Sequence, residues 1–279
     1  MKNQKNLLKY YSKVTVFRKI YKGVEFLKST VLERVLKLNK FLPVQEESRL
    51  EKYNSALHEL EKRSIRPMHL TEVIQIIRES GKLDLFQEEL DELREELLFC
   101  SSGHGITHCE RVALFAFAIG VLEKVSDEDL RILMESAKYH DIGRIDDNED
   151  KSHGRRSAEK FDEFEIGSTF SKEAKKILKA ICIGHSINDE DFEAVMQEFD
   201  IKEKENCQKV FKILKDADAL DRARLKYSAL DLQYLTIDDS IIDMNYLRTN
   251  YSKMMIPAAY ELYENYQHES ELCMEGNFN

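Results

Sequence analysis

Apolar residues recur every three or four positions along most of the chain, which is the spacing of one face of an α-helix. This pattern predicts helices over 46–66, 71–81, 85–98, 107–125, 126–140, 153–165, 171–185, 189–199, 204–226 and 242–268. The segment 107–125 is apolar almost all round, so we expect it to be a central, buried helix. Strand-like alternation is hard to find, and three prolines and ten glycines provide few of the tight turns that a β-sandwich or barrel needs. The predicted fold is therefore all-α, a helical bundle.

The N-terminal region carries a longer helical stripe of its own. Its apolar positions step by three or four from Leu7 to Leu42, which predicts a basic amphipathic helix over 5–42 that Pro43 ends. Residues 1–45 hold eleven Lys and Arg and two Glu, a net charge of +9, whereas the remainder holds 31 basic and 50 acidic residues, a net charge of -19. The helix either docks on the body or on a second copy in a homo-oligomer, or it binds an anionic partner such as lipid or nucleic acid. We expect residues 1–99 to form a helical extension, with acidic helices after the basic one, and residues 100–279 to form the main domain.

Cysteine usage and the absence of long apolar runs indicate a cytoplasmic protein. The five cysteines are odd in number and scattered, without CxxC spacing, which favours reduced thiols over disulfides or a thiolate metal site. The longest nearly apolar run, Val112 to Leu122, has 11 residues, whereas a transmembrane helix needs roughly 20. The N-terminus also lacks a secretory pattern. We therefore expect no transmembrane segment.

Histidines are concentrated in one stretch of the chain. Five of the eight lie between His104 and His185, and two aspartates, Asp141 and Asp218, stand at the ends of apolar helices. A lone histidine is usually a packed residue and a lone aspartate at a helix end is usually a cap. Imidazoles and carboxylates that separate helices bring together are, however, a ligand set for a divalent metal ion. The ordered series therefore predicts a metal site.

The series consists of five motifs. They are Gly103–Val112 (GHGITHCERV), Tyr139–Arg144 (YHDIGR), His153–Ala158 (HGRRSA), Gly184–Ser186 (GHS) and Lys215–Asp221 (KDADALD). Their order of His, His-Asp, His, His and Asp resembles that of the HD-domain superfamily of metal-dependent phosphohydrolases, over about residues 100–225. The resemblance implies an HD-type helical bundle that hydrolyses phosphate ester bonds.

The resemblance also implies roles for individual residues. The implied metal ligands, for one or two divalent ions (Mn, Co, Ni, Zn, Mg or Fe), are His108, His140, Asp141, His153, His185 and Asp218. The implied catalytic residues are His140, Asp141 and Arg111, and the implied substrate contacts are His104, Arg111 and Arg144. In binuclear members of the superfamily the two later histidines bind the second ion, whereas in mononuclear members these positions line the pocket. Because both histidines are present in the expected order, two ions are favoured.

Residue spacing adds two geometric expectations. His108 and Arg111 are three residues apart and share a helix face, so the arginine either forks onto a substrate phosphate or orients a carboxylate such as Asp216. The adjacent His140 and Asp141 would diverge by about 100° on a straight helix. Both reach one ion only if the helix ends there, and Ile142-Gly143 is a suitable end.

The predicted activity is hydrolysis of a phosphomonoester or phosphodiester, of a nucleotide or small phosphoester, by a metal-activated water. Asp146, Asp147 and Asp216 are candidates for a general acid or base, between which the sequence does not choose. Two alternatives belong to other classes of protein. An HD-type di-iron oxygenase would purify with iron, and a non-catalytic nucleotide-binding or sensor module would usually have lost one of the ligands.

Overall fold

The computed structural model describes residues 47–99, 101, 103–224 and 247–264, and the predicted basic helix over 5–42 lies outside them. The described part is all-α and contains no strand. Its helices are α3 (Glu47–Lys62), α4 (Leu70–Glu79), α5 (Leu83–Asp91), α6 (Ile106–Leu122), α7 (Asp127–Tyr139), α8 (His153–Glu163), α9 (Lys172–His185), α10 (Phe192–Glu198), α11 (Lys204–Leu220) and α12 (Asn250–Met254). Residues 256–264 are also helical. Within the described residues, no helix has the length and apolar character needed to cross a membrane.

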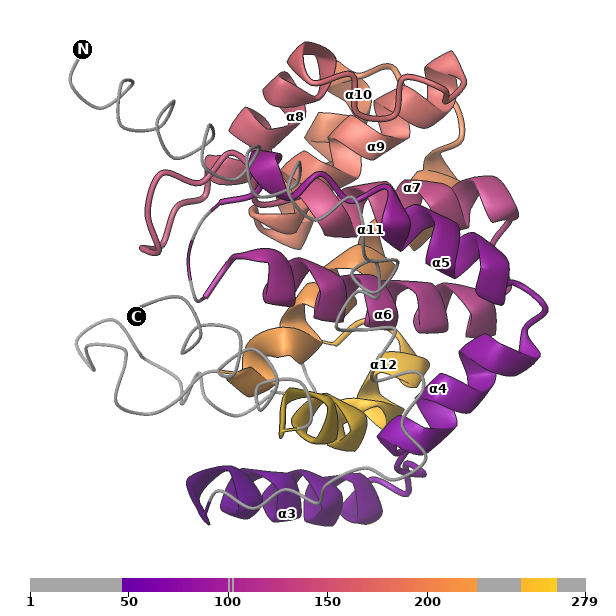
Figure 1. Cartoon of the computed structure of the whole chain (residues 1–279), viewed down its shortest axis with the longest axis vertical. Helices are drawn as coiled ribbons and strands as arrows, with labels where there is room; N and C mark the ends of the chain where they lie inside the picture. Colours follow the sequence, from indigo (N-terminus) through magenta and orange to yellow (C-terminus); the bar gives the residue numbers. More distant parts are fainter. Residues whose placement is uncertain (1–46, 100, 102, 225–246, 265–279) are drawn as a thin grey trace, which may run out of the picture.

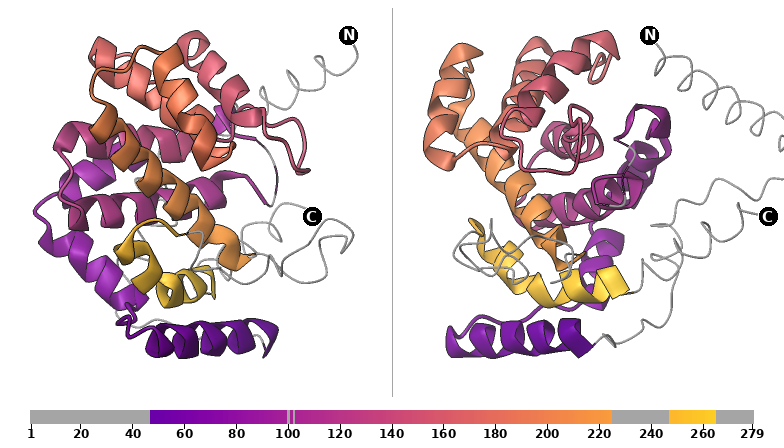
Figure 2. Two further views of the ribbon diagram at one scale, coloured as in Figure 1. Left: turned by 180° about the vertical axis from the view of Figure 1, so that it is seen from behind. Right: turned by 90° about the vertical axis from the view of Figure 1, so that its left-hand side faces the viewer.

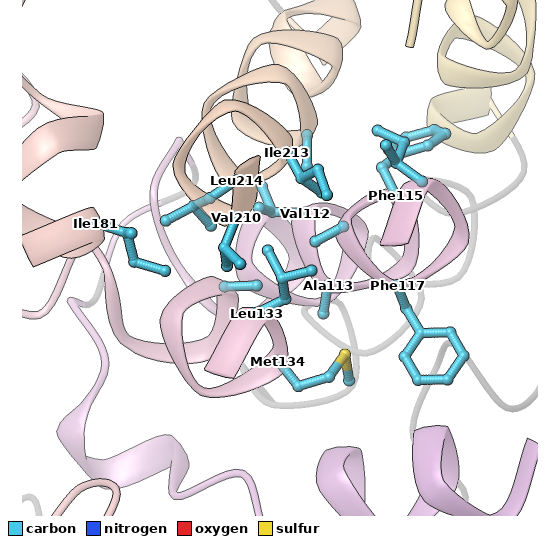
Figure 3. Packing of buried hydrophobic residues seen from close by; sticks show 14 of the residues in the cluster. Val112, Ala113, Phe115, Phe117, Leu133, Met134, Ile181, Val210, Ile213 and Leu214 are labelled. Atoms are coloured by element: carbon cyan, nitrogen blue, oxygen red, sulfur yellow. The ribbon is translucent and has the colours of Figure 1, made fainter. Parts of the chain in front are cut away.

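Helix α6 runs through the middle of the bundle, as its apolar sequence predicts. Every residue from His108 to Gly120 is buried. Figure 3 shows Val112 and Ala113 of α6 close to Leu133 of α7, with Leu214 of α11 nearby. Burial on all sides explains why this helix has no polar face.

The other helices form layers around α6 and α7. Helix α9 packs against α7, α8 and α11, and together with α8 and α10 it covers one end of the bundle (Figure 1). Helices α4 and α5 pack against α6 and α7 respectively, and their buried side chains belong to the same hydrophobic core. At the opposite end, α3 lies beside the helical segment 256–264 (Figure 2). Helices far apart in the sequence therefore share one core.

Most helix ends follow the expected signals, but four predicted helices differ from the expectation. Ser126 caps α7 by accepting a hydrogen bond from the Asp129 backbone N–H at 3.1 Å, as its position before three acidic residues indicates. The predicted helix 85–98 is instead α5 followed by a short 3-10 turn, η1 (Glu95–Leu97), and 204–226 is α11 followed by η3 (Asp221–Arg224). In both cases the apolar spacing continues across a change of backbone path, which periodicity alone does not detect. The predicted helix 189–199 begins with a 3-10 turn, η2 (Asp189–Asp191), before α10, and the described part of 242–268 is helical only over α12 and 256–264.

Candidate metal centre

The turn that follows α7 carries the paired residues His140 and Asp141. His140 is the C-cap of α7, so the helix ends at the position that lets the His140 and Asp141 side chains point toward the same place. Ser157 of α8 holds this turn, because its Oγ donates to the His140 carbonyl at 2.6 Å and accepts from the Gly143 N–H at 2.8 Å. A Cβ atom on Gly143 would lie 2.3 Å from the His153 carbonyl oxygen, so only glycine lets α8 come this close.

Close packing of α8 on α9 brings two more histidines together. A Cβ atom on Gly154 of α8 would lie 2.4 Å from the Cys182 carbonyl oxygen of α9, so the two backbones are nearly in contact. His153 is the first residue of α8 and His185 is the last of α9. As a result, their Nε2 atoms lie 2.7 Å apart.

The Asp141 carboxylate lies between two pairs of histidines and presents one oxygen to each. Its Oδ2 is 3.5 Å from the Nε2 atoms of both His108 and His140. Its Oδ1 is 3.1 Å from His153 Nε2 and 3.6 Å from His185 Nε2. We call His108, His140 and Asp218 with Asp141 Oδ2 the first half-site, and His153 and His185 with Asp141 Oδ1 the second half-site.

Asp218, at the end of α11, completes the first half-site. Its Oδ1 lies 3.4 Å from His108 Nε2 and 3.9 Å from His140 Nε2. The Asp218 side chain is 32% exposed, whereas those of His108, His140 and Asp141 are at most 3% exposed. The cluster therefore opens to solvent on the Asp218 side.

Hydrogen bonds at Nδ1 fix which nitrogen of each histidine carries the proton. The Nδ1 atoms of His140, His153 and His185 face the carbonyl oxygens three residues earlier in the chain, and that of His108 lies 2.7 Å from Asp221 Oδ2. Carbonyl and carboxylate oxygens only accept hydrogen bonds, so all four Nδ1 atoms must be donors. In a neutral imidazole the Nε2 atom then bears a lone pair.

Those lone pairs point at one another inside the protein. His108 Nε2 and His140 Nε2 are 3.0 Å apart, and the pair in the second half-site is closer still. Two acceptors at this distance repel each other unless a cation lies near both. Asp141 Oδ1 is also buried without a hydrogen-bond partner. These buried, unsatisfied acceptors fit divalent metal ions, and the geometric groups His108–His140–Asp218 and His140–Asp141–His185 could each hold one.

The protonation states agree with this fit. Burial lowers the pKa of His140 to about 3, so the imidazole is neutral and able to coordinate. For Asp141, burial raises the pKa, but the surrounding histidines outweigh it and hold the pKa well below its usual range. For Asp218, the same opposing effects of burial and of the nearby His108 and His140 bring the pKa to about 2. Both carboxylates are therefore ionised at neutral pH.

Two of the predicted substrate contacts lie at the edge of the cluster. His104 Nδ1 is 2.9 Å from Asp141 Oδ2, and Arg144 Nε is 2.9 Å from Asp141 Oδ1. Their side chains are 17% and 12% exposed, more than those of the buried ligands. Both therefore lie beside Asp141 at the more exposed edge of the cluster.

Arg111 is positioned differently. Its side chain is 3% exposed, and its Nε and Nη2 atoms both donate to the Asp221 carboxylate. The arrangement corresponds to the carboxylate-orienting alternative, with Asp221 in the place expected for Asp216.

Asp216 has other partners. It is buried and accepts hydrogen bonds from the Thr249 N–H and Ser252 Oγ, both at 2.7 Å. It anchors the chain before α12 and is poorly placed to move protons.

Two charged residues near the cluster, Asp221 and Arg224, are absent from the residues that the sequence predicted. Both lie in η3, directly after the helix that carries Asp218. Arg224 Nη1 donates to Asp221 Oδ2 at 3.1 Å, while its buried Nε has no hydrogen-bond partner. Asp221 is the last residue of the Lys215–Asp221 motif and Arg224 lies three residues beyond it, but the resemblance implies a role for neither.

Comparison with known proteins gives one match. Residues 105–223 match the family model described as the HD domain, and this range contains all six predicted metal ligands. No curated protein and no solved structure matches the chain. The matched range includes the residues that converge in the cluster, so residues 105–223 form an HD domain.

Proposed function

We propose that the protein is a metal-dependent phosphohydrolase that acts on a nucleotide or small phosphoester. The observation that carries this proposal is the pair of half-sites, in each of which the Nε2 lone pairs of two histidines face each other beside one oxygen of Asp141. His108, His140, Asp141 and Asp218 would hold one divalent ion, and His153, His185 and Asp141 a second. When bound, such ions supply Lewis acidity and a nucleophilic water at neutral pH.

The charge of the site favours an anionic substrate. Asp141, Asp218 and Asp221 are balanced by three guanidinium groups, those of Arg111, Arg144 and Arg224. Divalent ions would therefore give the site a positive net charge, which a phosphate group would neutralise. Hydrolysis by a metal-activated water would need neither an ATP-binding loop nor a nucleophilic side chain.

Residues at the open side would bind and orient the phosphoryl group. Arg144 and Arg224 each have a buried Nε without a hydrogen-bond partner. We propose that both guanidiniums donate to substrate oxygens, and that His104 contacts the substrate beside them. Burial is the largest influence on the pKa of His104 and lowers it, so a neutral imidazole can accept or donate a proton there.

The test combines metal content with hydrolysis. Elemental mass spectrometry of the native protein and of a His140→Ala/Asp141→Ala variant should show one or two equivalents of a divalent metal that the variant loses. Phosphate release from nucleoside mono-, di- and triphosphates, and nitrophenol release from p-nitrophenyl phosphate and its diester, should be at least 100-fold slower in the variant. His58→Ala is the matched control, because His58 is an exposed histidine of α3.

Other outcomes would assign the site to another function. Iron with a visible absorption band and oxygen consumption, but no phosphate release, would favour the di-iron oxygenase. No metal in the native protein, with none taken up on reconstitution with Mn²⁺ or Mg²⁺, would overturn the hydrolase and favour a non-catalytic sensor.

A further inference from the structure

The four histidines of the half-sites are supported in two different ways. Three of them, His140, His153 and His185, place Nδ1 against the neutral carbonyl of the residue three positions earlier. His108 lies in the first turn of α6, and the carbonyl three positions before it, that of Gly105, already accepts from the Cys109 N–H. Its Nδ1 lies instead 2.7 Å from Asp221, which is 113 residues away in the sequence.

Asp221 is held in a fixed orientation by two arginines. Its side chain is 2% exposed, and the carboxylate accepts from Nε and Nη2 of Arg111 and from Nη1 of Arg224. Arg111 belongs to the same helix as His108, one turn further along, so one face of α6 supplies two of the three partners of the carboxylate. His108, Arg111 and Asp221 are buried, and the Asp221 carboxylate is the group that His108, Arg111 and Arg224 all contact.

We propose that Asp221 is a positioning residue that fixes His108 in the Nδ1–H form and thereby strengthens the first half-site for a metal ion. The proposal rests on the proposed function only in that the half-sites bind metal, not in which ester is cleaved. A carboxylate at Nδ1 raises the basicity of the coordinating nitrogen more than a neutral carbonyl does. Arg111 is therefore one contact away from the metal ligand and acts through Asp221.

A difference between the half-sites follows from this arrangement. The second half-site has carbonyl-supported histidines only, so a change at Asp221 should affect the ion in the first half-site alone. Removing the partner of a coordinating histidine typically lowers metal affinity by about 10–100-fold. Asp221→Asn retains an oxygen that can accept from His108 but loses the charge that Arg111 and Arg224 bind.

The experiment isolates the first half-site with a His153→Ala background. Metal-free protein is titrated with Mn²⁺ by calorimetry, and the absorption spectrum of the Co²⁺-loaded protein is recorded. Adding Asp221→Asn should weaken Mn²⁺ binding by about 10–100-fold and shift the Co²⁺ bands. Asp216→Asn is the matched control, since Asp216 is a fully buried carboxylate on α11 that contacts no histidine. It should change neither the affinity nor the spectrum, even where it lowers the melting temperature.

Two results would overturn the proposal. One is an Asp221→Asn protein that binds Mn²⁺ as tightly as its His153→Ala parent, and the other is an equal loss in Asp216→Asn. If Asp221→Asn does not fold, Arg111→Lys replaces it, because lysine keeps the charge but loses the two-pronged contact with Asp221. Arg111→Lys should then weaken Mn²⁺ binding and shift the Co²⁺ bands, and unchanged values would contradict the proposal. Hydrolysis by the wild type together with unchanged metal affinity in the variants would leave the proposed function standing and the role of Asp221 refuted.

Discussion

Asp141 is the residue on which both half-sites depend, because each of its carboxylate oxygens faces a different pair of histidines. In the proposed two-ion site, this sharing means that substitutions of different ligands would have different effects. Loss of a histidine removes one ligand from one ion, whereas loss of the Asp141 charge removes a ligand and a compensating charge from both.

This asymmetry leads to a prediction of metal stoichiometry. Asp141→Asn, which preserves the size of the side chain, should lose both ions, whereas His153→Ala should lose one and retain the other. Elemental mass spectrometry after gel filtration measures both stoichiometries, with the exposed His58→Ala variant as reference. Retention of a full equivalent by Asp141→Asn would show that the carboxylate does not bridge.

The candidate ligands were accessible from sequence, but their supporting partners were not. The candidate ligands lie in five short motifs, and the order of these motifs can be read directly from the sequence: His108, His140 and Asp141, His153, His185 and Asp218. The partner of Arg111 depends on how α11 ends relative to α6. Asp216 and Asp221 are five residues apart, and a change from α-helix to 3-10 turn between them decides which one meets the arginine. The spacing of His108 and Arg111 on α6 therefore does not predict which of the two aspartates pairs with Arg111.

At the scale of elements, the site depends on how closely α8 approaches the turn after α7. Periodicity predicted both helices well, since their apolar faces are regular. It did not predict that the contact is made by the backbone at Gly143, where no side chain fits. Such a contact between backbones leaves no trace in the pattern of apolar residues, so the sequence does not predict it.

Gly143→Ala tests this contact. The added methyl would lie 2.3 Å from the His153 carbonyl oxygen and 2.4 Å from the Ser157 nitrogen, so α8 must move outward. We expect a loss of about 1–3 kcal/mol in the free energy of unfolding, the usual cost of overpacking, together with weaker binding at the second half-site. Denaturant titration and Mn²⁺ calorimetry measure the two effects.

Gly103→Ala provides the control for this substitution. A Cβ atom there meets its nearest neighbour, Asp147 Oδ1, at 3.6 Å, an ordinary contact. We expect its free energy of unfolding to stay within about 0.5 kcal/mol of the wild type. A Gly143→Ala protein as stable as Gly103→Ala would mean that the turn and α8 are not in close contact.

At the scale of the molecule, Glu261 joins the first described helices to the last. Its Oε1 accepts from Tyr53 OH of α3 at 2.8 Å and lies 2.7 Å from His69 Nδ1, and its Oε2 accepts from the Leu70 N–H of α4 at 2.7 Å. Glu261→Gln turns an amide N–H₂ toward one of these donors. We expect it to cost about 1–3 kcal/mol, measured by thermal unfolding. Glu59→Gln, which weakens only surface pairing with Lys62 and Arg63 at the end of α3, should cost less than about 0.5 kcal/mol, and an equal loss in both would refute the role of Glu261.

Metal binding should stabilise the whole bundle, because the half-sites draw on five separate helices or their ends. α6 supplies His108, the end of α7 supplies His140 and Asp141, α8 and α9 supply His153 and His185, and α11 supplies Asp218. Without a cation, repulsion between the facing Nε2 lone pairs destabilises the packing of these helices. A bound cation would replace this repulsion with bonds to ligands from several helices. A ligand at 100 times its dissociation constant stabilises the folded state by about 2.7 kcal/mol. For a chain of this size that corresponds to roughly 5–10 °C in melting temperature.

Chelation by EDTA should therefore lower the melting temperature by this amount, and Mn²⁺ should restore it. A His108→Ala/His153→Ala variant controls for effects of chelator or metal elsewhere on the acidic surface, because it lacks one ligand from each half-site. Its melting temperature should be insensitive to both additions. If EDTA and Mn²⁺ shift the variant as much as the wild type, the stabilising ions are bound elsewhere, and the convergence of the four imidazoles is a packing feature of the core.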